Sequence, residues 1–597
     1  MKKLIAILFL CCCFSQAYAA SEADNIANQQ GQVIQNQKQI DRQKELQVEL
    51  KQVTKDQAIK GEEEELEEDL SENDGKIIQN LRSIQCFRPQ KITFLGSKLL
   101  TAEEEKSLSE KYLDRCFTLA WLKKFDQEVD QVLFDKGYVT SHAKSSQQSL
   151  ISGDMTVEIT AGILEKIIIN EDSFSDKAKL LTTFGFDNFP KGGRILNIQE
   201  IDPALKRFNK LRSNNATIKI TPSKIPNHSI IVIENHPKDT ARINFTYDNI
   251  GSKTTGENRD TIAFAKDNLL HLNDSFNISR TSNDLDPQNN RRYNQALSGS
   301  WSVPFGVHNF TLSATKNSYS FLTGSSGKVL AQGFTLSKSF SIESLLFKSK
   351  GYKISSNFAL NNRDNQIFTN DVRNESQSRK ASIVTLAIPS SFLFDSSTLF
   401  LKPSYSKSLN ILNAKTDNPS VSRFSTHAEI EIFKFYANYE KKIVVPYFKN
   451  EAFYNVSLDS QLSKNHLYSV DQFSSGGFYS VRGFRSGSIL GDSGYNIRNE
   501  VTMNLGKLIS AENNLKNFPN LNHFSLSPFY DYGSVQNRGV ATNGRLSSVG
   551  FKIGFSKKNT NASLTFSHAL SRSRILNQSQ SDNNAIYFDT SFELDFL

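Results

Sequence analysis

Alternating apolar and polar positions dominate the chain from residue 242 to its last residues. Short runs such as 243–247, 310–314 and 564–566 carry an apolar side chain at every second position. This period of two is typical of strands that bury or expose one apolar face. Segments rich in Ser, Asn, Asp and Gly separate the runs. The pattern therefore predicts an all-strand region over residues 240–597.

The predicted strands have the composition of a membrane barrel. The chain contains 43 Phe and 18 Tyr but only 3 Met, which suits rigid strands and aromatic girdles. Only alternate residues of such strands face lipid, which explains the negative mean hydropathy. A sheet in a membrane must close, because its edges cannot face hydrocarbon. A secreted β-sandwich or β-solenoid is the alternative. The alternation that continues to the C-terminus and the absence of a fixed short repeat argue against it.

Residues 83–237 have a different pattern, in which helical and strand periods alternate. A strand around Ile92 and Phe94 is followed by a helix that begins at Thr101, where Glu104 completes a capping box. A second helix with one apolar side ends near Gly137. Two strands follow, and we expect one to begin at Val139 and the other to cover residues 155–159.

The same order of elements then occurs a second time. The pattern predicts a strand over 167–169, helices over 176–184 and 197–211, and strands over 216–220 and 230–233. Two copies of one α+β unit, each of about 75 residues, form an internal repeat.

The N-terminus has the features of an export signal. A basic start and an apolar run over 4–14 precede Ala17-Tyr18-Ala19, which predicts cleavage between Ala19 and Ala20. Residues from about 24 to 50 carry apolar side chains at roughly helical spacing in a polar segment. They predict a helix in mostly wet surroundings, with a partly disordered exported N-terminus as the alternative. Residues 51–82 include an acidic block and are typical of a solvated linker.

Charge and cysteine content exclude some classes of protein. The formal charge of +8 comes from 70 basic and 62 acidic residues, which are scattered and accompany no nucleic-acid recognition module. After signal removal, two cysteines remain, Cys86 and Cys116. A lone pair in an exported protein usually forms a disulfide. Two buried thiols are the alternative, and a metal site is disfavoured because neither cysteine has a His or Cys at ligand spacing.

The sequence contains no complete catalytic motif of three common classes. The segment 491–494 (Gly-Asp-Ser-Gly) is similar to the nucleophile segment of trypsin-like proteases, but none of the nine His lies in a matching histidine region. The segment 251–254 lacks the spacing of a phosphate-binding loop, and no His-Glu-x-x-His motif occurs. We therefore predict no enzyme activity, no catalytic residue, no cofactor and no metal site.

Several segments together resemble the TpsB transporters of two-partner secretion, a haemolysin-activator and CdiB-like family within the outer-membrane assembly-factor superfamily. The resemblance covers nearly the whole mature chain. The first repeat carries the cysteine pair and Lys136–Ser141, the second carries Leu211–Ile218, and Tyr247–Gly256 is similar to the start of the family's barrel. The most specific match is Val481-Arg482-Gly483-Phe484, followed by 491–494 and by Arg498-Asn499-Glu500.

The resemblance implies a domain plan and a site. Residues 83–163 and 164–237 would be two polypeptide-transport-associated (POTRA) domains, 240–597 a sixteen-stranded barrel, and 20–50 a plug helix in its pore. Cys86 and Cys116 would form the first domain's disulfide. Val481, Arg482, Gly483 and Phe484 would form the tip of a loop folded into the barrel. In the family the arginine of this tip pairs with an aspartate of the barrel wall, and the matching segment 529–533 implies a pair between Arg482 and Asp531. An arginine away from bulk water needs a carboxylate or several carbonyls, and it can hold a carboxylate at two points. A solvated loop arginine is the alternative.

The function implied is export of a partner exoprotein from the periplasm to the surface without ATP. The partner would be an adhesin, a cytolysin or a contact-dependent inhibition toxin. Further partners would be the lipids, the lipopolysaccharide and the barrel-assembly machinery of a Gram-negative outer membrane. Residues 20–237 would lie in the periplasm or in the pore. An assembly factor that inserts other barrels, or a passive porin, is the alternative. One departure is Leu597, which follows Phe596 where the family commonly ends on an aromatic residue.

Overall fold

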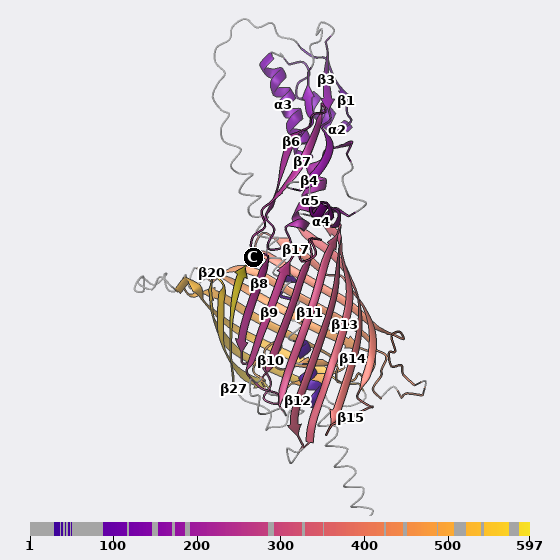
Figure 1. Cartoon of the computed structure of the whole chain (residues 1–597). Coiled ribbons are helices and arrows are strands. Elements are labelled where there is room, and N and C mark those ends of the chain that lie inside the picture. Colours follow the sequence, from indigo (N-terminus) through magenta and orange to yellow (C-terminus); the bar gives the residue numbers. More distant parts are fainter. Residues whose placement is uncertain are drawn as a thin grey trace, which may run out of the picture.

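The computed structural model describes most of the chain from residue 88 to residue 596 and part of the N-terminal segment. The gaps are 116–118, 146–152, 170–173, 186–191, 284–291, 325–328, 350, 419, 423–424, 446–449, 486–487, 507–520, 539–542 and 572–583. Of the N-terminal segment, 29–35, 37–39, 42, 46–47 and 49–50 are described. Two small α+β domains lie in a row beyond one mouth of a large closed barrel (Figure 1).

The first domain has the predicted order of elements. Its sheet has the order β1-β3-β2, with β1 parallel to β3 and β2 antiparallel. The strands and helices are β1 (Lys91–Gly96), α2 (Ala102–Glu110), α3 (Leu119–Asp135), β2 (His142–Lys144) and β3 (Asp154–Thr160). The capping box at Thr101 and Glu104 is confirmed, and Gly137 beyond α3 has a φ of +87°. The strand expected from Val139 begins three residues later, because the Ser141 amide turns back to the Tyr138 carbonyl.

The second domain repeats this plan. Its sheet has the order β5-β4-β7-β6, again with a parallel central pair, β4 and β7. The elements are β4 (Ile163–Ile169), α4 (Phe174–Phe184), β5 (Arg194–Ile195), α5 (Ile198–Phe208), β6 (Ala216–Pro222) and β7 (His228–Asn235). The short β5 was not predicted. The predicted helix over 197–211 ends at Phe208, since Asn209 and Asn214 satisfy neighbouring backbone groups with their side chains.

The barrel is antiparallel and closed. Eighteen strand segments form it, and because β15, β16 and β17 are consecutive pieces of one strand, the barrel has sixteen strands. Strand β27 pairs with β8 from Phe596–Ala241 to Asp589–Asp248, which closes the sheet. The strands are β8 (Ala241–Asp248), β9 (Arg259–Asp267), β10 (Ser275–Asn283), β11 (Tyr293–Phe305), β12 (His308–Thr323), β13 (Val329–Lys348), β14 (Tyr352–Thr369), β15 (Val372–Arg373), β16 (Arg379–Ala387), β17 (Ser390–Phe394), β18 (Ser397–Leu409), β19 (Glu431–Val445), β20 (Asn450–Ser463), β23 (Ser493–Asn504), β24 (Phe524–Gln536), β25 (Gly544–Lys557), β26 (Thr560–Ser571) and β27 (Asn584–Phe596).

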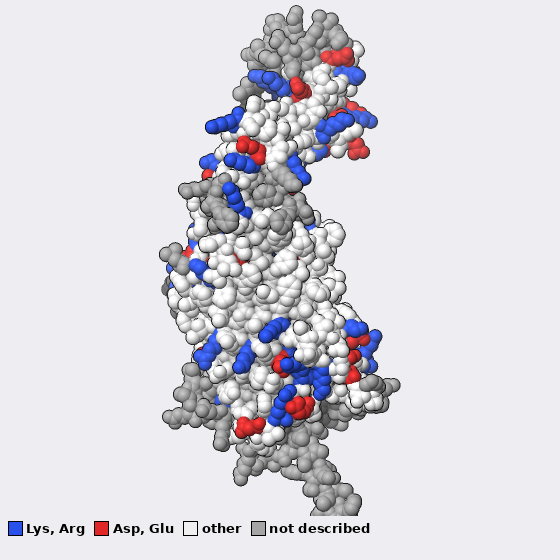
Figure 2. Space-filling view, turned by 45° about the vertical axis from the view of Figure 1, so that its right-hand side comes forward, with Lys and Arg blue, Asp and Glu red and all other residues white. Residues whose placement is uncertain are grey.

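The barrel wall is apolar outside and polar inside. Side chains such as Phe245, Leu312 and Phe551 are exposed on the outer face, whereas Asn365 and Ser382 are buried. In Figure 2 the middle of the barrel surface carries almost no charged residues. The charged residues of the barrel gather instead at the end away from the two domains. No described helix is both long and apolar enough to cross a bilayer. The exposed apolar and buried polar side chains of the strands confirm the alternation predicted from the sequence as a barrel pattern.

The strand connections distinguish the two ends of the barrel. At the end that faces the α+β domains most of them are short, such as 306–307, 395–396 and 558–559, and 505–523 is the long exception. At the other end they include 410–430 and 464–492. Short turns on the periplasmic side and long loops on the outer side are typical of such barrels. The second domain is fixed to the barrel, where the Thr182 hydroxyl donates to the Leu272 carbonyl at 2.9 Å.

Candidate functional site

The connection between β20 and β23, residues 464–492, folds back into the barrel, and we refer to it as the inward loop. Within it, β21 (Phe473–Ser475) pairs with β22 (Ile489–Gly491). The turn beyond β21 uses Gly476 and Gly477, with φ of +111° and +106°, a region that side chains rarely adopt. The loop rests on the wall through an apolar cluster of Phe473, Val481, Phe484, Ile489, Val535, Leu546 and Ala569.

Arg482 at the tip of the inward loop is buried against the wall. Its Nε donates to Asp531 Oδ2 at 2.7 Å and its Nη2 to Asp531 Oδ1 at 2.8 Å. The third nitrogen, Nη1, donates to Glu500 Oε2 at 2.7 Å. The guanidinium also lies 3.4 Å from the centre of the Phe529 ring. The structure thus brings the predicted pair together in a two-point contact, the geometry for which arginine is suited.

The backbone of Arg482 is held as firmly as its side chain. Its amide donates to Asp531 Oδ2 at 3.2 Å, and its carbonyl accepts from Ser567 at 2.9 Å and from Tyr587 at 2.8 Å. Sequence reasoning did not assign Glu500, Ser567 or Tyr587 to the site. Alternation along each strand could have placed these side chains inside, but not at the loop tip, because that depends on where the loop folds.

The tip fits only without a side chain at residue 483. A Cβ built on Gly483 would lie 2.8 Å from Ser548 Cβ and 3.0 Å from Ala569 Cα. The wall likewise has no room for a side chain at residue 533, because a Cβ built on Gly533 would lie 1.9 Å from Ser475 Oγ of the loop. Both contacts are tighter than packed atoms allow, so a residue with a side chain would separate loop and wall.

We expect Gly483→Val to loosen the tip by about 1–3 kcal/mol, the usual cost of overpacking. The expected result is a folded barrel with more frequent open events in planar-bilayer recordings. Gly299→Ala is the control, since a Cβ there meets nothing within 4 Å. An equal frequency of open events in the two variants would contradict the fit described above.

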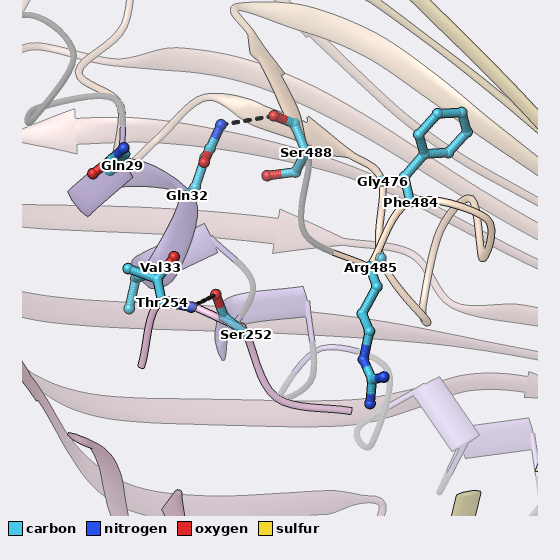
Figure 3. Close-up of a pocket in the computed structure, with 10 residues that line it drawn as sticks. Gln29, Gln32, Val33, Ser252, Thr254, Gly476, Phe484, Arg485 and Ser488 are labelled. Carbon is cyan, nitrogen blue, oxygen red and sulfur yellow. Dashed lines mark hydrogen bonds between the residues drawn. The ribbon is translucent and has the colours of Figure 1, made fainter. Parts of the chain in front are cut away.

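A helix of the N-terminal segment occupies the space beside the inward loop. Three glutamines on one side donate to loop carbonyls: Gln32 to Ser488 at 2.8 Å, Gln35 to Ser469 at 2.8 Å and Gln39 to Ser474 at 2.7 Å. Figure 3 shows the first of these contacts and the small cavity that the helix, the inward loop and residues 252–254 share. The described helical residues of 29–50 therefore lie in the barrel lumen.

The apolar residues of this helix face the wall. Val33 and Ile34 pack in a cluster with Tyr319, Phe321, Ala331 and Val470, and Leu46 packs with Phe400 and Tyr436. Farther along, Arg42 Nη1 donates to Asp459 Oδ2 at 2.9 Å, and Lys402 donates to Glu49 at 2.6 Å. Most of its other contacts are thus polar, as the composition of the segment indicated.

Asp471 connects the inward loop, the wall and the helix. Its carboxylate accepts from Arg363 Nη2 at 2.7 Å and from Arg379 Nη2 at 2.5 Å, both on the wall. Lys38 of the helix lies 3.9 Å from the same carboxylate and donates to the Val470 carbonyl. We call these four side chains the Asp471 cluster. Sequence reasoning missed it, because no spacing indicates that residues 38, 363, 379 and 471 meet.

The Gly-Asp-Ser-Gly segment, residues 491–494, lies at the base of the inward loop and holds it through hydrogen bonds of Asp492. Asp492 accepts from His466 Nδ1, the Leu467 amide and the Arg538 amide, each at 2.8 Å. These bonds tie both ends of the loop to the outer rim. The His466 bond raises the pKa of that imidazole, although partial burial opposes the shift.

Several predicted residues lie outside the described part of the chain. These are Cys86 and Cys116, the signal and its cleavage site at Ala19 and Ala20, the linker 51–82 and Leu597. Among the described residues, no three His, Cys, Asp or Glu side chains gather in a way that could hold a metal ion.

Comparison with known proteins decides the family. The model of the haemolysin secretion/activation proteins ShlB/FhaC/HecB matches residues 227–557, more than half of the chain. The chain belongs to this family. A ShlB-type POTRA domain model also matches residues 87–162, in the first α+β domain. The resemblance to TpsB transporters of two-partner secretion is confirmed, and the protein is placed in the outer membrane.

Individual relatives agree with this assignment to the TpsB transporters. The outer membrane transporter CdiB of Dickeya dadantii is 28% identical over 408 residues, which are 66% of this chain and 68% of that protein. The hemolysin transporter protein HpmB of Proteus mirabilis is 25% identical over 323 residues, 54% of this chain and 53% of that protein. In fold, the chain matches CdiB from Escherichia coli with a TM-score of 0.69 at 19% identity, covering 90% of this chain and 98% of that one.

Proposed function

We propose that this transporter recognises an unfolded partner exoprotein in the periplasm and passes it through the barrel to the cell surface without ATP. The observation that carries the proposal is the way the lumen is filled. Apart from two small apolar clusters, the plug helix is held by glutamine-to-carbonyl bonds and ion pairs. Water can replace each of the hydrogen bonds at a modest net cost of about 1 kcal/mol. A helix held in this way can leave and return, whereas a packed core could not.

The two POTRA domains would supply the site for recognition. Strand β6 is an outer strand of the second sheet, and β1 and β2 are the outer strands of the first. An extended chain can add to such an edge through backbone hydrogen bonds, with little demand on its sequence. The domains lie directly beyond the mouth of the barrel (Figure 1), so a captured segment would be close to the pore.

The partner would be an exoprotein of the adhesin, cytolysin or contact-dependent inhibition class, by analogy with the relatives named CdiB and HpmB. Folding of the exoprotein outside the cell would make its return unfavourable. The free energy of this folding would drive export in place of ATP hydrolysis. The barrel-assembly machinery would insert the transporter itself.

An assembly factor is the second candidate. The chain matches BamA from Haemophilus ducreyi with a TM-score of 0.50 at 13% identity, over 85% of this chain and 100% of that chain. That likeness concerns the fold alone. The helix that occupies the lumen favours a transporter, because insertion of other barrels does not require a removable plug.

A comparison of secreted and surface proteins with and without the gene tests the proposal. We expect the loss of one large, β-rich exoprotein, restored by the gene in trans. A fall in many barrel proteins would indicate an assembly factor. No change in a strain that expresses a candidate exoprotein would contradict the proposal and leave the porin alternative.

A further inference from the structure

A hollow of about 370 Å³ lies on the outer wall of the barrel near the rim farthest from the POTRA domains. Tyr405, Phe433 and Leu462 form its apolar floor and are exposed at 42%, 43% and 61%. These three residues are paired across neighbouring strands, Tyr405 with Phe433 and Phe433 with Leu462, so they point to the same face. Their strand neighbours Ile432 and Gln461 are buried on the lumen side. The hollow therefore faces the membrane.

Basic side chains border this apolar floor on the side of the rim. Lys464 and Arg538 line the hollow, and Lys407 lies two residues beyond Tyr405 on the same face of β18. The one acidic residue of the lining, Glu431, accepts a hydrogen bond from the Tyr405 hydroxyl. Glu431 also interacts electrostatically with Lys464 and Lys407. Among the described residues, the Lys464 ammonium makes no hydrogen bond and no ion pair within 4 Å. Figure 2 shows the wider arrangement, an uncharged band with charged residues at its outer end.

An apolar floor below a basic border matches one kind of molecule in this membrane. Acyl chains would lie along Tyr405, Phe433 and Leu462, and an anionic head would meet the cations at the level of the rim. We propose that the hollow binds the phosphorylated glycolipid of the outer leaflet, lipopolysaccharide, with its phosphate on Lys464 and Arg538. A free phosphate would use only the border, and an uncharged lipid would use only the floor.

The proposed site also contacts the base of the inward loop. The Arg538 amide donates to Asp492 at 2.8 Å and its Nε to the Ser463 carbonyl at 2.9 Å, where β20 passes into the loop. A phosphate that fixes the Arg538 side chain would thereby fix both ends of the loop. The lipid of the outer leaflet would thus stabilise the arrangement in which the loop occupies the lumen.

Native mass spectrometry of the full-length protein in detergent tests this site, with bisphosphorylated lipid A as the probe. We expect Lys464→Ala to weaken binding about tenfold, the loss typical of one charged hydrogen bond. Arg538→Ala should do the same, and dephosphorylated lipid A should bind the unaltered protein as weakly. Lys441→Ala is the control, because Lys441 is an exposed residue of β19 at the POTRA end.

Three results would overturn the proposal. Equal affinity of Lys464→Ala and Lys441→Ala for lipid A would remove the site from the hollow. Equal affinity of the unaltered protein for lipid A with and without phosphates would show that acyl chains alone drive binding. Inorganic phosphate that displaces the lipid at millimolar concentration would assign the border to a soluble anion instead. Because the Lys464 side chain makes no hydrogen bond to a described residue, we expect Lys464→Ala to leave the barrel folded.

Discussion

Replacement of Arg482 by alanine should reduce secretion of the partner exoprotein by at least about tenfold while the barrel remains assembled. The change removes the cation from two buried carboxylates, and breaking a buried pair from one side typically costs about 3–5 kcal/mol. Arg498, 3.8 Å from Asp531, and Lys552, 2.7 Å from Glu500, remain and would reduce this loss. They belong to the wall, however, and cannot hold the tip of the inward loop.

Secretion would be measured as exoprotein in the culture medium per amount of transporter in the outer membrane. Heat-modifiable migration on gels would show that the barrel is folded. Arg373→Ala is the matched control, since that arginine pairs with Glu375 on the exposed outer end of the barrel. Arg482→Lys should recover only part of the activity, because an ammonium cannot make the two-point contact with Asp531. Normal secretion by Arg482→Ala would exclude the loop tip from the mechanism.

The sequence pattern was sufficient to predict the strands of the barrel wall, because the alternation within each strand separates the side chains of its two faces. Phe245 and Tyr247 flank Thr246, and that order alone indicates which side chains meet lipid. The number of strands cannot be read from the pattern within any one strand. It depends on how many strands close the sheet and on whether interruptions such as 388–389, between β16 and β17, begin a new strand or only bend an existing one. Here the family resemblance provided the expected number, and the closed sheet agrees with it.

The lumen was only partly predictable, for a different physical reason. The pairing of Arg482 with Asp531 was expected from the family motif, and an isolated buried arginine would have required some carboxylate in any case. The contacts of the plug helix could not be derived in the same way. Val33 and Ile34 indicated a helix with an apolar side, but that side packs on Tyr319 and Phe321, nearly 300 positions away, and no local pattern specifies such a partner.

The Asp471 cluster is the part of the site with the largest consequence for the plug. Asp471→Asn should leave Arg363, Arg379 and Lys38 close together without their shared counter-charge. Two of these cations are anchored in strands of the wall, whereas Lys38 is on a segment that can leave. Repulsion should therefore act mainly on the helix, and the open state of the pore should become at least tenfold more frequent, equivalent to about 1.4 kcal/mol.

The measurement is single-channel conductance of the purified protein in planar bilayers, together with sensitivity of cells to a large antibiotic that the plugged barrel excludes. The double variant Asp471→Asn/Lys38→Gln separates the two causes that the single variant combines. If repulsion on the helix opens the pore, removal of the Lys38 charge should return the open frequency toward that of the unaltered protein. If the loop itself has been displaced, the double variant should stay open. An unchanged open frequency in Asp471→Asn would mean that the glutamine contacts of the helix to Ser469, Ser474 and Ser488 hold the plug without this carboxylate.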